Sequence, residues 1–128
     1  MILDSSALVA IVMAEPGADA LLHKIRNATV RGIGAPTLLE ASIVLAARLR
    51  GDPSVLLFEL LRELDVEIVS FTREHSEIAL SAFLNFGKGR HHAALNFGDC
   101  LAYAAASAAK EALLFVGADF SKTDIIAA

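Results

Sequence analysis

The chain has 128 residues, a formal net charge of −4, one cysteine and a hydrophobic content of 55%. A single cysteine excludes an internal disulfide and fits a reducing cytoplasm. The longest wholly apolar run, 7–14, is too short for a transmembrane helix of ~20 residues, and no basic region precedes an apolar stretch as in a signal peptide. We therefore expect a single cytoplasmic domain over residues 1–128, with surplus apolar surface that requires a second copy or a partner protein.

The first half of the chain predicts two strands and four helices. Met1-Ile2-Leu3 is a short apolar run that ends at Asp4, and Ser5 and Ser6 are suited to cap the helix that follows. The apolar periodicity, together with Pro and Gly as start and stop signals, indicates helices at 7–13, 16–26, 38–50 and 54–64, and a strand at 30–34.

The second half continues the alternation of strands and helices. The pattern predicts a strand at 66–71, a helix at 73–86, a loop at 87–98, an Ala-rich helix at 99–111 and an apolar strand at 113–116. Strands separated by helices form β-α units, so the fold class is α/β, a three-layer α/β/α sandwich with a mostly parallel central sheet. Such sheets bind ligands at the carboxyl ends of their strands.

Four acidic residues stand in apolar surroundings, where a carboxylate is costly unless it is paired or binds a cation. Asp4 follows the first strand, Glu40 lies in an apolar helix, Asp99 begins the Ala-rich helix and Asp119 follows the last strand. Each has an ordinary alternative as a helix cap, a dipole contact or a loop residue. The nearest basic residue to Glu40 is Arg48, two turns on and on roughly the same helix face.

A divalent cation would explain why these carboxylates converge. Grouped acids repel one another, and desolvation raises their pKa values, whereas a bound cation removes both costs. All-oxygen ligation selects Mg²⁺, or Mn²⁺, over zinc. Such a metal can activate a water and stabilise the leaving oxygen in phosphodiester hydrolysis.

A basic cluster lies in a stretch, 78–98, that contains no acidic residue. Its members are Lys88, Arg90, His91 and His92. A basic loop beside an acidic centre suits docking of a polyanion, and it is equally compatible with an ordinary solvated loop.

Five segments, spread over nearly the whole chain, carry a resemblance to a known family. They are MILDSSAL at 1–8, APTLLEA at 35–41, GKGRH at 87–91, LNFGDCLAYA at 95–104 and LLFVGADFSKTDI at 113–125. In this order and spacing the chain resembles the PIN-domain ribonucleases of the VapC toxin type, which are encoded in bacterial toxin–antitoxin pairs. Each segment alone is a weak signal, and together they are highly specific.

The resemblance implies Mg²⁺-dependent endonucleolytic cleavage of RNA by a quartet of Asp4, Glu40, Asp99 and Asp119. Asp4 and Asp99 would be the firmest metal ligands, with the other two binding directly or through water. Ser6 would orient Asp4 or a metal-bound water.

The resemblance also implies roles for the basic loop and for partners. Lys88, Arg90 and His91 would face the RNA backbone, with transfer RNA as a candidate substrate. The family's fourth acid is variable, so Asp124 could share or take the role of Asp119. A homodimer is expected, inhibited by a cognate VapB-like antitoxin whose C-terminal segment covers the acidic groove.

Other interpretations remain. A catalytically degenerate PIN domain would bind RNA or the antitoxin without turnover. A phosphoryl-transfer enzyme of the dehalogenase type would need a second aspartate where Ser6 stands, and a receiver-like domain would need a lysine after the last strand, where Gly117 stands. Cys100 could act as a nucleophile with His91 or His92, but a buried small residue is the simpler interpretation.

Overall fold

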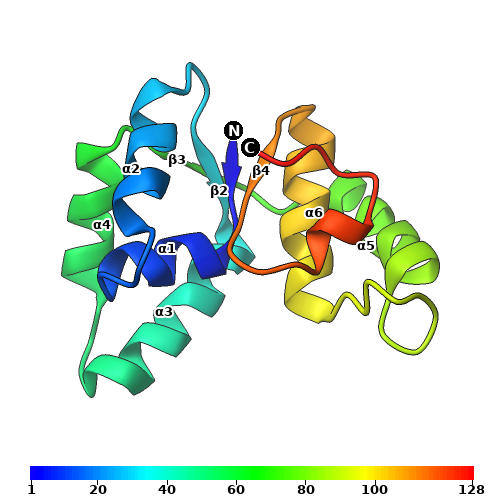
Figure 1. Ribbon diagram of the computed structural model, residues 1–128, viewed down its shortest axis with the longest axis horizontal. Coiled ribbons are helices and arrows are strands. Elements are labelled where there is room, and N and C mark those ends of the chain that lie inside the picture. Colours follow the sequence, from blue (N-terminus) through cyan, green and yellow to red (C-terminus); the bar gives the residue numbers. More distant parts are fainter.

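Four short strands form the centre of the structure, a computed structural model that describes all 128 residues (Figure 1). The sheet order is β3-β2-β1-β4, and every neighbouring pair is parallel. The strands are β1 (Ile2–Leu3), β2 (Gly32–Gly34), β3 (Glu67–Val69) and β4 (Leu113–Leu114). The predicted α/β class and mostly parallel sheet are confirmed, but the strands are shorter than predicted because only two or three residues of each apolar run pair with a neighbour.

Helices cover both faces of this sheet (Figure 1). One layer holds α1 (Ser5–Val12), α2 (Ala18–Asn27), α3 (Ala35–Leu49) and α4 (Ser54–Glu63). The other holds α5 (Arg73–Phe86) and α6 (Phe97–Ala109), and a short 3-10 helix, η1 (Phe120–Lys122), follows the last strand. None of these helices combines the length and the apolar character that crossing a membrane would take.

The core lies on both sides of the sheet because successive strand residues point to opposite faces. Leu3 packs with Ile33 and Leu114 against the layer of α1 to α4, whereas Ile2 packs with Leu113 against α5 and α6. The small alanines of α6 are buried on that second side, so α6 can pack closely on the sheet. Each half of the sandwich therefore has its own apolar cluster.

Several helices begin earlier or later than predicted, and the caps give the reason. Helix α1 begins at Ser5 because the Asp4 side chain, not Ser5 or Ser6, is its cap. Helix α2 begins at Ala18, after Gly17 in a left-handed conformation, rather than at residue 16. Helix α6 begins at Phe97 because Asn96 is its cap, which makes Asp99 the third residue of the helix and not its first.

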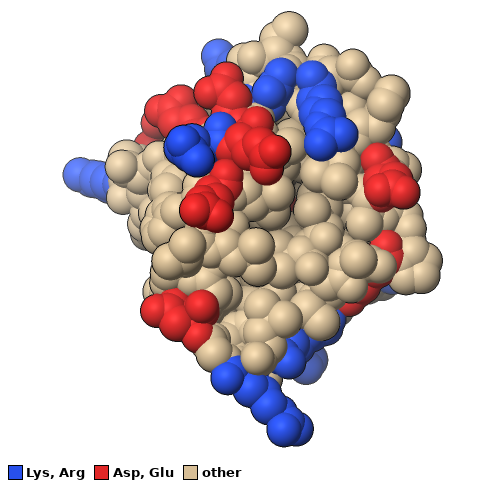
Figure 2. Space-filling view, turned by 90° about the vertical axis from the view of Figure 1, so that its left-hand side faces the viewer, with Lys and Arg blue, Asp and Glu red and all other residues tan.

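Many large apolar side chains remain on the surface, as the composition predicted. Phe97 at the start of α6 is 81% exposed and Val55 on α4 is 72% exposed. Figure 2 shows the outer face of the α1–α4 layer, where acidic and basic side chains are mixed in the upper part, uncharged residues cover most of the middle and basic side chains gather at the lower tip. Exposed apolar surface of this extent is typical of proteins that associate with another chain.

Candidate active site

Asp4 lies at the carboxyl end of β1 and is at the same time the N-cap of α1. Its side chain is buried, with 4% of its surface exposed. Its Oδ2 atom accepts hydrogen bonds from the backbone N–H of Ser6, at 3.0 Å, and from the Ser6 hydroxyl. Because one residue ends a strand and starts a helix, the carboxylate is fixed at the rim of the sheet.

Ser6 connects this carboxylate to the other end of the chain. Its hydroxyl donates to Asp4 and accepts a hydrogen bond from the backbone N–H of Val116, at 3.0 Å. Val116 belongs to the segment that leaves β4 and carries Asp119 three residues later. The serine thus fixes the position of Asp4 relative to the segment that carries Asp119.

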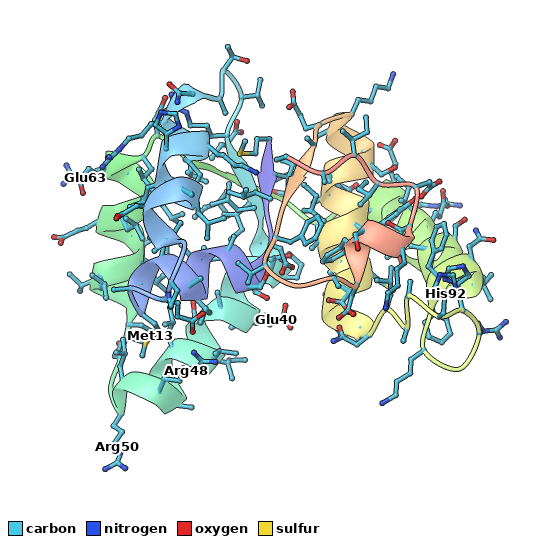
Figure 3. The ribbon with its side chains drawn as sticks, in the orientation of Figure 1. Met13, Glu40, Arg48, Arg50, Glu63 and His92 are labelled. Atoms are coloured by element: carbon cyan, nitrogen blue, oxygen red, sulfur yellow. The ribbon has the colours of Figure 1, made fainter.

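Glu40 projects from α3 toward α6 at the lower edge of the sheet (Figure 3). Its carboxylate lies against the backbone of Gly98, where an added Cβ would be 2.3 Å from Oε1. Burial raises the pKa of Glu40 above its ordinary value; the Ser5 hydroxyl lowers it and the negative charge of Asp4 raises it further. Arg48, the nearest basic residue in the sequence, does not neutralise Glu40, because it pairs with Glu15 at 2.8 Å.

Asp99 lies in the first turn of α6, opposite Glu40. It forms a capping box with Asn96, in which the Asn96 N–H donates to Asp99 Oδ2 at 2.8 Å and the Asp99 N–H donates to Asn96 Oδ1 at 2.9 Å. Burial raises the pKa of Asp99 to about 6, the Asn96 N–H lowers it, and the charges of Asp4, Asp119 and Glu40 raise it. All four predicted acids therefore lie close enough for three of them to act on the fourth.

The last two acids take different places. Asp119 is exposed at the start of η1, and its charge acts on Asp99. Asp124 instead accepts a hydrogen bond from the Tyr103 hydroxyl at 2.6 Å. Burial and this bond raise the pKa of Tyr103. The Asp124 carboxylate therefore ties the C-terminal segment to α6, while Asp119 lies near enough to Asp99 for its charge to raise the pKa of that carboxyl.

The acidic cluster has no basic partner within the chain. The three ion pairs of the structure join Met1 to Glu111, Arg48 to Glu15 and Arg73 to Glu77. No three acidic, histidine or cysteine side chains are close enough to hold a metal ion by themselves. Mg²⁺ typically takes only one or two carboxylates and completes its shell with waters and substrate oxygens. The all-oxygen donors and the raised pKa of Asp99 fit such an ion.

The predicted basic loop lies beside the start of α6 and is closed by a bridge between Gly87 and Leu95 (Figure 1). Lys88 and Arg90 are exposed, and the Arg90 guanidinium lies 5.5 Å from the ring centre of Phe83. His91 is half-buried, and its Nδ1 accepts the backbone N–H of Ala93 at 3.1 Å. One nitrogen of His91 thus stabilises the loop. The free positive charges of the loop are those of Lys88 and Arg90.

Sequence reasoning missed three residues near the site. The pattern Asn96-x-x-Asp99 signals a capping box, and reading it would have placed the helix start correctly. Thr37 lies on α3 one turn before Glu40, and its buried hydroxyl has no hydrogen-bond partner. Gly98 contacts the Glu40 carboxylate, and nothing in the sequence signals that contact.

Cys100 is buried, and burial raises the pKa of its thiol, so it is a poor nucleophile.

Comparison with known proteins places these residues in a family. The family model of the PIN domain matches residues 1–126. Ribonuclease VapC36 of Mycobacterium tuberculosis is 46% identical over 127 residues, which cover 98% of this chain and 91% of that protein. Ribonuclease VapC of Mycolicibacterium smegmatis is 38% identical over 128 residues, covering 99% and 98% of the two chains.

Solved structures agree on the fold. The sarcin-ricin loop cleaving toxin VapC20 of M. tuberculosis superposes with a TM-score of 0.79 at 15% identity, covering 99% of this chain and 97% of that one. A toxin–antitoxin complex from Klebsiella pneumoniae gives a TM-score of 0.72 at 13% identity, with 99% and 95% coverage. From its sequence relatives and its fold, the chain belongs to the VapC family of PIN-domain proteins.

Proposed function

We propose that the protein is a metal-dependent endoribonuclease and the toxin of a toxin–antitoxin pair. The observation that carries this proposal is the cluster of four carboxylates without a basic partner, in which burial and then the charges of the other three acids raise the pKa of Asp99 to about 6. A divalent cation, Mg²⁺ or Mn²⁺, would relieve that repulsion; when bound, it activates a water and stabilises the leaving oxygen of a phosphodiester. The relatives named as ribonucleases support the same activity.

The four acids have different roles in the proposed metal site. Asp4 and Asp99 would be the primary ligands, because both carboxylates are held in place by hydrogen bonds from neighbouring backbone N–H groups. Glu40 and Asp119 would bind the metal directly or through water. Ser6 orients Asp4, and the Asn96 N–H orients Asp99.

The RNA lies across the rim of the sheet with its phosphates toward the basic loop. Lys88 and Arg90 are exposed beside the start of α6 and would contact the backbone phosphates, and the free nitrogen of His91 would do the same. Contacts of this kind position a nucleic acid without reading its bases. Transfer RNA is the substrate class we favour, on the resemblance to VapC toxins.

Cleavage of a labelled total-RNA pool by the purified protein tests this function. Discrete fragments that need Mg²⁺, disappear with EDTA and are lost in Asp99→Asn would support a metal-dependent endoribonuclease. No cleavage by protein that binds the metal would instead favour a catalytically degenerate PIN domain that only binds RNA or its partner. Asp99→Asn keeps the shape of the side chain and removes its charge.

A cognate antitoxin of the VapB type is the proposed inhibitor. The uncompensated charge of the acidic cluster would attract a basic segment, and such a segment would exclude both metal and RNA. A fold neighbour solved as a toxin–antitoxin complex supports this partner. We place the pair in the cytoplasm, which suits a chain with one free, buried cysteine.

A homodimer would cover the apolar surface around Phe97. That side chain borders a groove of about 480 Å³ between α5 and α6, which Leu80, Phe83 and Leu101 also line. On its other side lie exposed residues of α3, Leu39 and Ile43. A patch that spans three helices and contains an exposed aromatic residue is typical of a protein interface.

A further inference from the structure

Gly98 is the second residue of α6, directly before Asp99. The space that its side chain would occupy is filled by the Glu40 carboxylate. A Cβ built on Gly98 would lie 2.3 Å from Oε1, 2.7 Å from Oε2 and 2.8 Å from Cδ of Glu40. All three distances are shorter than a Cβ atom tolerates, so any residue other than glycine would displace the carboxylate.

The backbone itself gives no reason for a glycine at this position. The glycines with positive φ are Gly17, Gly89 and Gly117, so Gly98 has a conformation open to any residue. Glycine inside a helix costs stability relative to alanine. The contact with Glu40 is thus the structural feature that requires glycine here.

We propose that Gly98 is a positioning residue for the metal site. The missing side chain allows the Glu40 carboxylate to lie against the first turn of α6, next to Asp99. There it joins a donor set that is drawn from two facing helices. The inference rests on the proposed function insofar as the ligand of that donor set is a divalent cation.

The Glu40 carboxylate is the far end of a flexible side chain, and this determines what a substitution does. An alanine at position 98 would turn the carboxylate toward solvent rather than disrupt the packing of α3 against α6. The fold would keep its stability, because alanine favours the helix and the displaced charge regains water. The loss would fall on metal binding.

Calorimetric titration with Mn²⁺ tests this in a double-mutant cycle of Gly98→Ala and Glu40→Ala. Gly98→Ala is expected to weaken Mn²⁺ binding on the order of 10–100-fold, the usual effect of disturbing a group that supports a metal site. In the Glu40→Ala background the same substitution should change the affinity no further. Thermal unfolding of the wild type and of Gly98→Ala, both in EDTA, should show that Gly98→Ala is no less stable than the wild type.

Gly51→Ala is the matched control, because Gly51 is exposed and a Cβ there meets no atom within 4 Å. It should bind Mn²⁺ like the wild type. Unchanged affinity in Gly98→Ala would overturn the proposal, as would an equal loss in the presence and absence of Glu40, since Gly98 would then act through the backbone or Asp99.

A crystal structure of metal-free Gly98→Ala separates this inference from the proposed function. A Glu40 carboxylate turned away from α6 supports the positioning of Glu40 by Gly98; if the wild type then neither bound Mn²⁺ nor cleaved RNA, the metal site and the proposed function would be overturned and the Gly98–Glu40 contact would stand. An unmoved carboxylate overturns the positioning role whatever the activity shows.

Discussion

Ser6 and Val116 are 110 residues apart in the chain, yet the Ser6 hydroxyl accepts a hydrogen bond from the Val116 N–H at 3.0 Å. The same hydroxyl donates to Asp4. One small side chain therefore fixes Asp4 relative to the segment that carries Asp119. This arrangement suits a hydroxyl, because its single oxygen atom can donate to one partner while accepting from the other.

Ser6→Ala should reduce both RNA cleavage and stability. The substitution leaves the Val116 N–H without its acceptor and Asp4 without one donor, so the free energy of unfolding should fall by about 1 kcal/mol. Cleavage should fall further than stability explains, because Asp4 loses its orientation. Urea unfolding of the metal-free protein and cleavage at saturating Mg²⁺ measure the two effects separately.

Ser54→Ala is the matched control for this prediction. Ser54 donates through its backbone N–H and its hydroxyl to Asp52 at the start of α4, which repeats the local pattern of Ser6 and Asp4 far from the acids. Its loss should leave cleavage unchanged. An equal loss of cleavage in both variants would mean that Ser6 acts only on folding.

The stability of the metal-free protein should fall as the pH rises from about 4 to about 6. The pKa of Asp99 is raised from 3.8 to about 6 in the folded protein, so the folded state binds more protons than the unfolded state across this interval. A shift of ~2 units corresponds to about 3 kcal/mol, and solvent screening of this half-buried group reduces it to about 1–2 kcal/mol. Denaturant unfolding at a series of pH values measures the loss.

Asp99→Asn isolates this contribution from all other titrating groups. The difference in unfolding free energy between variant and wild type should grow with pH up to about 6 and stay constant above it. Saturating Mg²⁺ should remove the difference by stabilising only the wild type. A difference that does not vary with pH would show that Asp99 has an ordinary pKa.

The sequence was sufficient for the fold class because strands and helices alternate and each carries a clear apolar pattern. It could not give the strand order, which depends on how crossovers place β1 between β2 and β4. Helix starts were missed at Asp4 and Asn96, where a polar side chain caps the helix three residues before the predicted start at 7 or 99.

The candidate site was predicted as a list of acids, and its internal contacts were not. Asp4, Glu40, Asp99 and Asp119 could be selected because each is a charge in an apolar or strand-end setting. The pairing of Asp124 with Tyr103 and the contact of Glu40 with Gly98 join segments that are far apart in the chain. Such contacts depend on the packing of α3, α6 and the C-terminal segment, which no local pattern encodes.

Asp119→Asn should reduce RNA cleavage, whereas Asp124→Asn should reduce stability. Asp119 is exposed and repels Asp99, so its neutralisation should lower cleavage at limiting Mg²⁺ without loss of stability. The Asp124 carboxylate accepts a hydrogen bond from the Tyr103 hydroxyl. Asparagine keeps an acceptor oxygen but loses the charge that strengthens this bond, so the free energy of unfolding should fall by about 1 kcal/mol while cleavage by the folded protein stays nearly intact. RNA cleavage measured at a series of Mg²⁺ concentrations, together with thermal unfolding, distinguishes the two variants.

Tyr103→Phe provides the control for Asp124. It removes the donor of this hydrogen bond, whereas Asp124→Asn only weakens the acceptor, so the two effects on stability should not add in the double variant. If Asp124→Asn abolished cleavage while Tyr103→Phe did not, Asp124 would be the fourth acid of the metal site.

Phe97→Ser should weaken the proposed homodimer and shift it toward the monomer. Phe97 is 81% exposed at the centre of the apolar patch formed by α3, α5 and α6, and burying an aromatic side chain contributes about 1.5–3 kcal/mol to an interface. Sedimentation equilibrium at several protein concentrations measures the dissociation constant. Val55→Ser removes a side chain of 72% exposure from α4, in the opposite layer, and should leave the dimer intact. A wild type that sediments as a monomer at every concentration would contradict the dimer and leave the Phe97 surface without a second copy to cover it.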